Sequence, residues 1–284
     1  MTRASGRRLQ QVDPAPGDVI DIWDVATLDG ELTSALGENA DLICSYWSEN
    51  ARLFREREAQ TVRGPPEENR FSNAYQELKE RVGKLMESRT IRAWHYTRLT
   101  DAEVARIRTD GIQPMTLAMI RERLDAAVVD GAMDSTAANA LFDASPYHRQ
   151  IDGNRQDKTW FAAEPFSVAS SDVEELLATW GGESIGWAHR SGPTRDLLMG
   201  IGRPRVLEVE LPLLSSTRVY EAGCAVIDAY SLQLGCSGAW PPGADIVVVE
   251  PVLPEWIVDV HSEGDEAYRL MGRGYPSAYV NREN

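Results

Sequence analysis

Hydrophobic side chains recur at helical spacing in the first part of the chain. Between residues 71 and 87 the apolar positions are Phe71, Ala74, Tyr75, Leu78, Val82 and Leu85. Positions three and four residues apart lie on one face of a helix, so this segment predicts an amphipathic helix. A second helix is predicted over residues 38 to 60, where Ile43, Trp47 and Phe54 share a face.

After residue 90 the pattern changes to short strands separated by helices. The segment "TIRAWHY" predicts a strand, and Thr100 and Glu103 then form a capping box that begins a helix. Gly111 is placed to end this helix. Residues 115 to 143 predict two helices that are separated near Gly131.

A second short strand is predicted at "KTWFAA", which ends at Glu164. Ser171 and Glu174 predict another capping box, and with it another helix. The predicted buried face of that helix consists of Val173, Leu176, Leu177 and Trp180. The two glycines that follow, Gly181 and Gly182, are expected to end it.

The C-terminal part is richer in strand patterns. In "RVLEVELP" three aliphatic residues alternate with Glu208 and Glu210, which predicts a strand with one face in water. "ADIVVVEP" is a continuous apolar run and predicts a central strand, and "EWIVDV" predicts another strand. Helices grouped early and strands that mostly follow one another indicate an α+β fold. We expect a helical N-terminal extension over residues 1–90 and an α+β domain over residues 91–284.

Composition narrows the function classes. The formal net charge is −15, and an acidic chain is poorly suited to coating duplex DNA, although a local basic groove could still hold a short strand or a nucleotide. No apolar run approaches the roughly 20 residues that span a bilayer. Three cysteines, an odd count without metal-like spacing, suit reduced thiols in the cytoplasm. The four histidines are far apart, so no metal site is predicted, and no glycine-rich loop indicates a Rossmann or P-loop site.

One segment carries candidate chemistry: "AWHYTRLTDAEVARIRTDGI", residues 93 to 112. It places His95 before Tyr96 and Thr97 at the end of a predicted strand, and a capped helix with Ile and Gly at its end follows. This segment resembles the first NAD-binding segment of the ADP-ribosyltransferase superfamily, to which diphtheria toxin and the poly(ADP-ribose) polymerases belong. The resemblance implies that His95 bonds the ribose next to the nicotinamide and that Tyr96 and Thr97 help to hold the cofactor. Strand alternation alone places Tyr96 on the face opposite His95, where it can simply be core.

Two later segments resemble the same superfamily. In "DKTWFAAEPF" the resemblance implies that Trp160 or Phe161 stacks on the nicotinamide ring. "GADIVVVEPVLPEWI" resembles a late strand that begins with a catalytic glutamate, but the matching position holds Asp245. A carboxylate there stabilises the positive charge that builds on the ribose, and aspartate is one methylene shorter. Glu183 in "WGGES" and Glu250 are the other candidate acids for this role.

The resemblance covers roughly residues 91 to 262 and implies an ADP-ribosyltransferase-like split β-sandwich that binds NAD between two small sheets. It implies transfer of ADP-ribose to a protein or nucleic-acid acceptor, with nicotinamide release, and a catalytic role for Asp245 or Glu183. Such proteins act as bacterial toxins or in phage defence, some of them with a neutralising protein partner. A catalytically silent NAD-binding module of the same fold is the first alternative, since Asp245 departs from the pattern.

A serine hydrolase is the second alternative. Gly182 to Gly186 match Gly-x-Ser-x-Gly, with Ser184 as the candidate nucleophile. Asp228 or Asp245 and then His261 follow in the chain order of an α/β-hydrolase triad. That motif requires a strand directly before the serine, and the sequence predicts a helix there instead.

Overall fold

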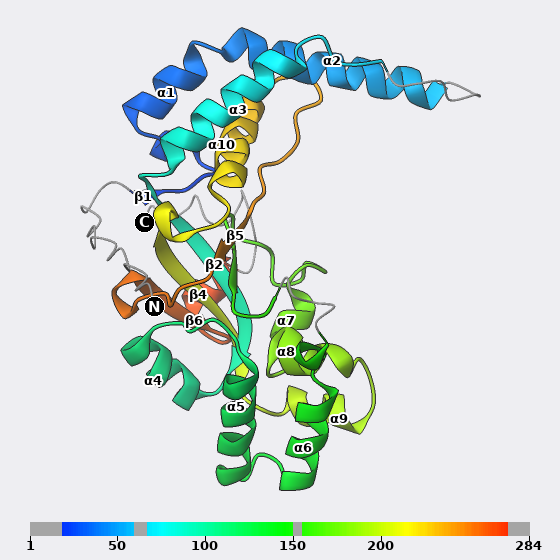
Figure 1. Ribbon diagram of the computed structural model, residues 1–284, viewed down its shortest axis with the longest axis vertical. Coiled ribbons are helices and arrows are strands. Elements are labelled where there is room, and N and C mark those ends of the chain that lie inside the picture. The colour runs from blue at the N-terminus through cyan, green and yellow to red at the C-terminus, as the bar shows by residue number, and fades with distance from the viewer. Residues whose placement is uncertain (1–18, 60–66, 150–154, 272–284) are drawn as a thin grey trace, which may run out of the picture.

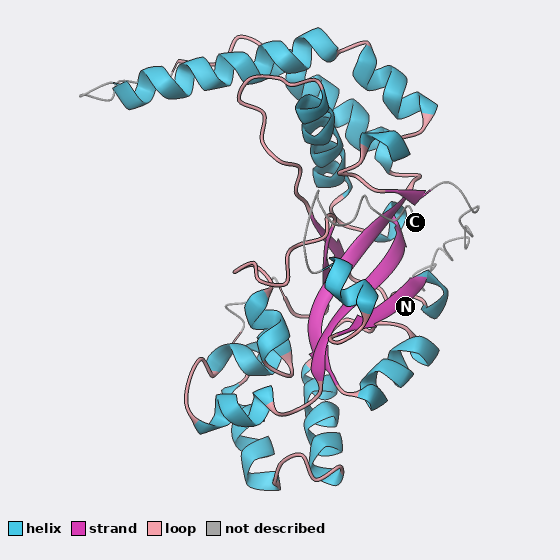
Figure 2. Ribbon diagram, turned by 180° about the vertical axis from the view of Figure 1, so that it is seen from behind, coloured by secondary structure: helices cyan, strands magenta, loops and turns pink. Residues whose placement is uncertain are grey.

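The computed structural model describes residues 19–59, 67–149 and 155–271. Within these ranges the chain forms one six-stranded sheet with helices at both ends and on both sides (Figures 1 and 2). This confirms the α+β fold class. The strands are β1 (Val19–Ile20), β2 (Thr90–Leu99), β3 (Thr159–Ala162), β4 (Arg203–Pro212), β5 (Asp245–Val248) and β6 (Ile257–Ser262).

The sheet has the order β5-β3-β2-β4-β6, and β1 adds to β2 in parallel. We expected two small sheets and a central "ADIVVVEP" strand; both expectations were wrong. All six strands belong to one sheet, and β5 lies at its edge. Among the described residues β5 forms a ladder with β3 and an isolated bridge with Ser216. A run of apolar residues cannot distinguish a central strand from an edge strand whose outer side is covered by helices.

Strand β2 is paired very differently along its two edges. Its whole length forms an antiparallel ladder with β4, from Thr90 opposite Pro212 to Leu99 opposite Arg203. On the other edge β3 contributes a single pair, Trp94 opposite Ala162. Beyond this pair β2 and β3 part, so the sheet is split next to the second half of β2.

The N-terminal helices are α1 (Gly30–Gly37), α2 (Ala40–Ala59) and α3 (Ser72–Met86), and they pack with α10 (Val219–Gln233) at one end of the sheet (Figure 1). Helices α2 and α3 confirm two sequence predictions. Phe54, however, is 68% exposed, because the C-terminal half of α2 projects beyond the body of the molecule. Helices α3 and α10 cross closely at Gly83 and Gly223, where a Cβ on Gly223 would lie 2.6 Å from the Cα of Gly83.

The N-terminal helices share their core with the sheet. The largest hydrophobic cluster joins Leu32 and Val82 of the helices to Leu207 and Val248 of the strands. The residues predicted as an extension therefore pack directly against the sheet. Their helices stabilise the strands that carry the candidate site.

A disulfide strengthens this junction. Cys44 in α2 is bonded to Cys236 just after α10, across 192 residues of sequence, and Cys224 is the free cysteine. The expectation of three reduced thiols was wrong, because Cys spacing along the chain does not show which cysteines meet in space.

Loss of this disulfide is expected to destabilise the fold. The Cys44→Ser/Cys236→Ser variant should lose about 2–4 kcal/mol of unfolding free energy, since the bond restricts a long loop in the unfolded chain. Urea denaturation with and without reductant measures the difference. Cys224→Ser is the matched control, and an equal effect of reductant on all three proteins would contradict the assignment.

The remaining helices are α4 (Asp101–Asp110), α5 (Leu117–Val129), α6 (Ser135–Ala144), α7 (Glu174–Ala178), α8 (Gly182–Ile185), α9 (Pro193–Met199) and α11 (Glu266–Met271). Short 3-10 helices cover Val25–Thr27, Pro146–His148, Gly186–Ala188, Leu213–Ser215 and Pro254–Trp256. The Thr100–Glu103 capping box, the stop at Gly111 and the break near Gly131 are confirmed. Within the described ranges, no helix has both the length and the apolar character that a membrane span requires.

The second predicted capping box was wrong. Helix α7 begins at Glu174, after Val173 as its N-cap, and no side chain caps it. The hydroxyl of Ser170 instead donates to Asp172. Such local side-chain hydrogen bonds compete with helix capping. The predicted buried face of this segment is largely correct, since Val173, Leu177 and Trp180 are buried.

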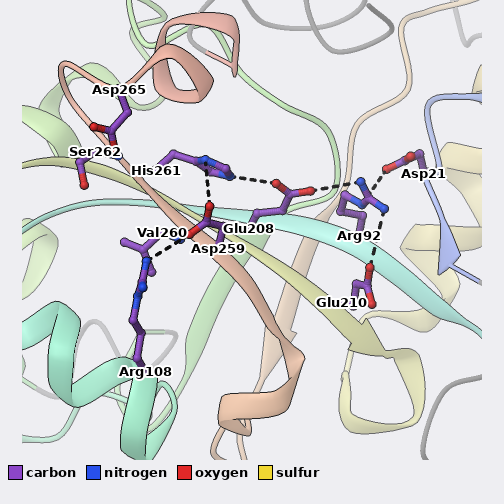
Figure 3. A network of polar contacts seen from close by, with 10 residues as sticks. All are labelled: Asp21, Arg92, Arg108, Glu208, Glu210, Asp259, Val260, His261, Ser262 and Asp265. Atoms are coloured by element: carbon purple, nitrogen blue, oxygen red, sulfur yellow. Dashed lines mark hydrogen bonds and ion pairs between the residues drawn. The ribbon is translucent and has the colours of Figure 1, made fainter. Parts of the chain in front are cut away.

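The prediction that Glu208 lies on a solvent-exposed face of strand β4 was wrong. This carboxylate is 4% exposed and lies between Arg92, at 3.1 Å, and His261, at 2.9 Å (Figure 3). Alternation correctly placed Glu208 on the face opposite Leu207, but the pattern could not show that β2 and β6 bring cationic and imidazole side chains to that face.

Candidate functional site

A cavity of about 1390 Å³ lies where β2 and β3 part. Seven of the residues that the sequence predicted for the site line it: His95, Tyr96, Thr97, Trp160, Phe161, Glu183 and Asp245. The other candidate acid, Glu250, does not line the cavity. The cavity exceeds the roughly 300–1,000 Å³ of most small-ligand sites, so it has room for a ligand as large as a dinucleotide. Its lining includes Leu207 on one face of the sheet and Val173 beside the other, so the split opens it to both faces.

His95 bridges the split between the two strands. Its Nδ1 lies 2.8 Å from the carbonyl oxygen of Trp160. A carbonyl only accepts, so Nδ1 carries the proton and Nε2 presents a lone pair. Burial, together with the positive charge of Arg123, lowers the pKa of His95. The ring is therefore a neutral imidazole with Nε2 as an acceptor for a ligand hydroxyl.

The two aromatic candidates on β3 have different environments. Phe161 is 2% exposed and belongs to the main core, with its ring 5.6 Å from the ring of His95. Trp160 is partly exposed, and the guanidinium carbon of Arg155 lies 4.2 Å from its ring centre. Of the pair, Trp160 is the one whose ring a planar ligand can stack on.

Tyr96 and Thr97 lie on opposite faces of β2. The side chain of Tyr96 is buried in a small cluster with Trp94, and its hydroxyl accepts a hydrogen bond of 2.7 Å from the backbone N–H of Phe166. Its polar atom is thus already used within the fold. Thr97 is only partly buried and points to the same face as His95, as strand alternation indicated.

The acids approach the cavity from two directions. Asp245 is exposed at the first position of β5, opposite Ala162, on the sheet face that carries Trp94 and not His95. Glu183 comes from α8, and its carboxylate lies 3.3 Å from Nε of Arg155, the residue that covers Trp160. Trp160, Arg155 and Glu183 therefore form one connected group inside the cavity.

The sequence did not single out Glu164. It follows β3 directly, is 7% exposed, and accepts a hydrogen bond of 3.4 Å from the N–H of Ala244, next to Asp245. Burial and the neighbouring Asp245 raise the pKa of Glu164 to about 7. A charged residue directly after a strand was the available signal, but Glu164 does not line the cavity, and its contact with the loop before β5 joins residues 80 positions apart.

Glu164 makes a pH-dependent contribution to stability. Its folded pKa is above the ordinary value of 4.5, so the folded state holds the proton more tightly. Its stabilising contribution is complete below about pH 4.5 and is lost as pH rises through 7. Between pH 5 and 8 the variant Glu164→Gln should lose less unfolding free energy than wild type, by on the order of 1–3 kcal/mol. Chemical denaturation at several pH values checks this; the exposed Glu250→Gln is the control, and parallel curves for Glu164→Gln and wild type would contradict it.

Glu103 and Arg123, which line the cavity, belong to a largely buried polar group. Glu103 accepts hydrogen bonds from Arg123 Nε at 2.7 Å and from Trp180 Nε1 at 2.9 Å, in addition to its capping contact with Thr100. The sequence showed Glu103 only as a capping residue. Its partners lie 20 and 77 residues away, so local pattern could not reveal them.

The Gly-x-Ser-x-Gly motif does not form a hydrolase site. Ser184 is 4% exposed, and its hydroxyl donates to the carbonyl of Gly181 at 2.8 Å. No strand precedes it: the element before it is α7, and Ser184 itself lies in α8. His261 is bonded to Glu208 on the sheet and does not line the cavity.

Among the described residues, no group of three or more His, Cys, Asp or Glu side chains is arranged to hold a metal ion. Comparisons of the chain with models of protein families, with curated proteins and with solved structures found no match.

Proposed function

We propose that this protein is an NAD-dependent ADP-ribosyltransferase. The observation that carries the proposal is the meeting of three separate chain segments, around His95, Trp160 and Asp245, in the lining of one cavity. Each of these segments resembles a sequence segment of that superfamily. They are up to 150 residues apart along the chain, and the split between β2 and β3 brings them together.

In the proposed reaction, Nε2 of His95 accepts a hydrogen bond from a hydroxyl of the ribose that bears the nicotinamide. The nicotinamide–ribose bond breaks, and its electron pair leaves with neutral nicotinamide. Positive charge then develops on the ribose, and a carboxylate, from Asp245 or Glu183, stabilises it. The acceptor's nucleophile forms the new bond to the same ribose carbon and gives up its proton.

Trp160 stacks on the nicotinamide ring in this proposal. In the structure the guanidinium of Arg155, a planar cation, lies over the Trp160 ring at 4.2 Å and pairs with Glu183. The positively charged nicotinamide of NAD is a planar cation of similar kind, so it can replace Arg155 on the same surface. Its arrival would displace Arg155 from the Trp160 ring.

The direct test is nicotinamide release from NAD by purified protein, with and without cell extract as a source of acceptor. Release should survive Ser184→Ala, because the Ser184 hydroxyl points to Gly181. Asp245→Asn and Glu183→Gln identify the acid: the variant that lowers release by about 100-fold or more names it. Loss of release in Ser184→Ala, with labelling of Ser184 by a fluorophosphonate, would reject the proposal.

A silent NAD-binding module is the second candidate function. The position of Asp245 favours it, since this carboxylate is exposed and lies on the sheet face opposite His95. Such a protein would bind NAD without releasing nicotinamide from it. Calorimetric binding of NAD with no release in any extract would favour the module over the enzyme.

A further inference from the structure

A second cavity, of about 570 Å³, lies beside the first. The two cavities share three lining residues, Glu103, Arg106 and Arg123. Away from this junction the second cavity is lined largely by Trp180 and by small or aliphatic residues such as Ala126, Ala127, Ala132 and Ile201. Its volume is within the range of ordinary small-ligand sites.

Arg123, at the junction, has an unused donor. The residue is 8% exposed, its Nε donates to Glu103, and its guanidinium lies 4.8 Å from the ring centre of Trp180. Its Nη2 is buried, and within the described ranges no acceptor is within hydrogen-bonding distance of it. A buried donor without a partner is unfavourable, so the geometry suits an acceptor supplied by a ligand.

The positive charge at this junction also affects the first cavity, because Arg123 contributes to the lowered pKa of His95. Arg106, one turn after Glu103 on α4, is exposed and lines both cavities. Glu103 is occupied by Arg123, Trp180 and the Thr100 N–H, while the other acids of the second cavity, Asp130 and Asp196, are exposed and can turn to solvent. The Arg106 side chain and the unused Nη2 of Arg123 therefore remain to donate to an anion.

We infer that Arg106 and Arg123 form a diphosphate-binding subsite at the junction of the two cavities, and that the second cavity takes the attached nucleoside. The ligand class is a nucleoside diphosphate, alone or as half of a dinucleotide. Forked guanidinium donors suit phosphate oxygens, and the apolar walls with Trp180 suit a base and sugar. For the dinucleotide the inference rests on the proposed function: NAD would lie with its nicotinamide half near His95 and its adenosine half beyond Arg123.

The test uses ADP and adenosine as probes in isothermal titration calorimetry on the full chain. Wild type should bind ADP at least about tenfold more tightly than adenosine, because two guanidinium groups face the diphosphate. Arg106→Ala should weaken ADP binding about tenfold and leave adenosine binding unchanged. Arg108→Ala, two residues along the same helix and outside both cavities, should bind both probes as wild type does.

Arg123→Lys tests the buried donor. It keeps one charge near Glu103 but removes the forked group, so ADP binding should fall by about tenfold or more. Arg121→Lys on the same helix is its control, and thermal unfolding of each variant separates lost binding from lost fold. Ala126→Phe, at an exposed position lining the second cavity, should weaken both adenosine and ADP.

Equal affinities for ADP and adenosine, no detectable ADP binding, or unchanged ADP binding in Arg106→Ala and folded Arg123→Lys would overturn the subsite. ADP binding with the expected losses but no nicotinamide release from NAD would keep the subsite and reject the transferase. Release that proceeds in every variant with an unchanged KM for NAD would do the reverse.

Discussion

Nicotinamide release by the His95→Ala protein is expected to fall at least about 100-fold below wild type. His95 is held by one strong contact, from Nδ1 to the Trp160 carbonyl, and this contact fixes Nε2 as the acceptor. Alanine removes both the acceptor and the group that bridges β2 and β3. Loss of a single well-placed polar contact to the reacting part of a substrate commonly costs about 10²–10³ in rate.

The pH profile of the wild-type protein gives a second readout. Burial and Arg123 lower the pKa of His95 from its ordinary value of 6.5, so the ring stays neutral into mildly acidic solution. Release should therefore be maintained as pH falls through 6.5 and decline only at lower pH. The initial rate of nicotinamide release at saturating NAD, measured from pH 5 to 8, records this.

His148→Ala is the control for His95. His148 is exposed, its Nε2 lies 2.9 Å from the Phe142 carbonyl, and it does not line the cavity. Its variant should release nicotinamide at the wild-type rate. If His95→Ala keeps more than about a tenth of wild-type release while remaining folded, His95 is not the group that orients the ribose.

The candidate residues could be listed from the sequence because each lies in a short local pattern. His95 lies in the strand that leads into a capped helix, although β2 continues to Leu99 and does not end at His95 as predicted, and Trp160 and Phe161 form part of another short strand. Such patterns do not show how deeply each side chain is buried or which groups it contacts. Phe161 and Trp160 are neighbours, yet one is in the core and the other faces Arg155, because the two sides of β3 pack against different surroundings.

Long-range pairings account for what the sequence missed. The alternating pattern around Glu208 predicted the strand correctly, but its buried ion pairs come from residues 116 and 53 positions away. The link between Cys44 and Cys236 likewise depends on how α2 packs beside α10. Strand and helix periodicity describe one element at a time, whereas burial of charge and covalent cross-links depend on which elements meet.

Replacement of Glu208 by alanine is expected to cost about 3–5 kcal/mol of unfolding free energy. Glu208 pairs with Arg92 at 3.1 Å and with His261 at 2.9 Å, and its side chain is only 5% exposed (Figure 3). Removal of the carboxylate leaves Arg92 largely buried, and among the described residues its remaining carboxylate neighbours are the more distant Asp21 and Glu210, at 3.6 and 3.7 Å. A buried charge that loses its partner cannot recover the hydration it gave up on folding.

The matched control is Glu210→Ala on the same strand and the same face. Its carboxylate is 32% exposed and makes only the longer contact to Arg92, so its loss should change stability by less than about 1 kcal/mol. Urea denaturation at pH 7 measures both variants, with the slope m compared to confirm that the unfolded states are alike. The double variant Arg92→Met/Glu208→Leu should recover part of the loss, because neither member of the Arg92–Glu208 pair is then left without the other. Equal costs for Glu208→Ala and Glu210→Ala would show that the buried pairs do not stabilise the sheet, and the strands around the cavity would then depend on their apolar face alone.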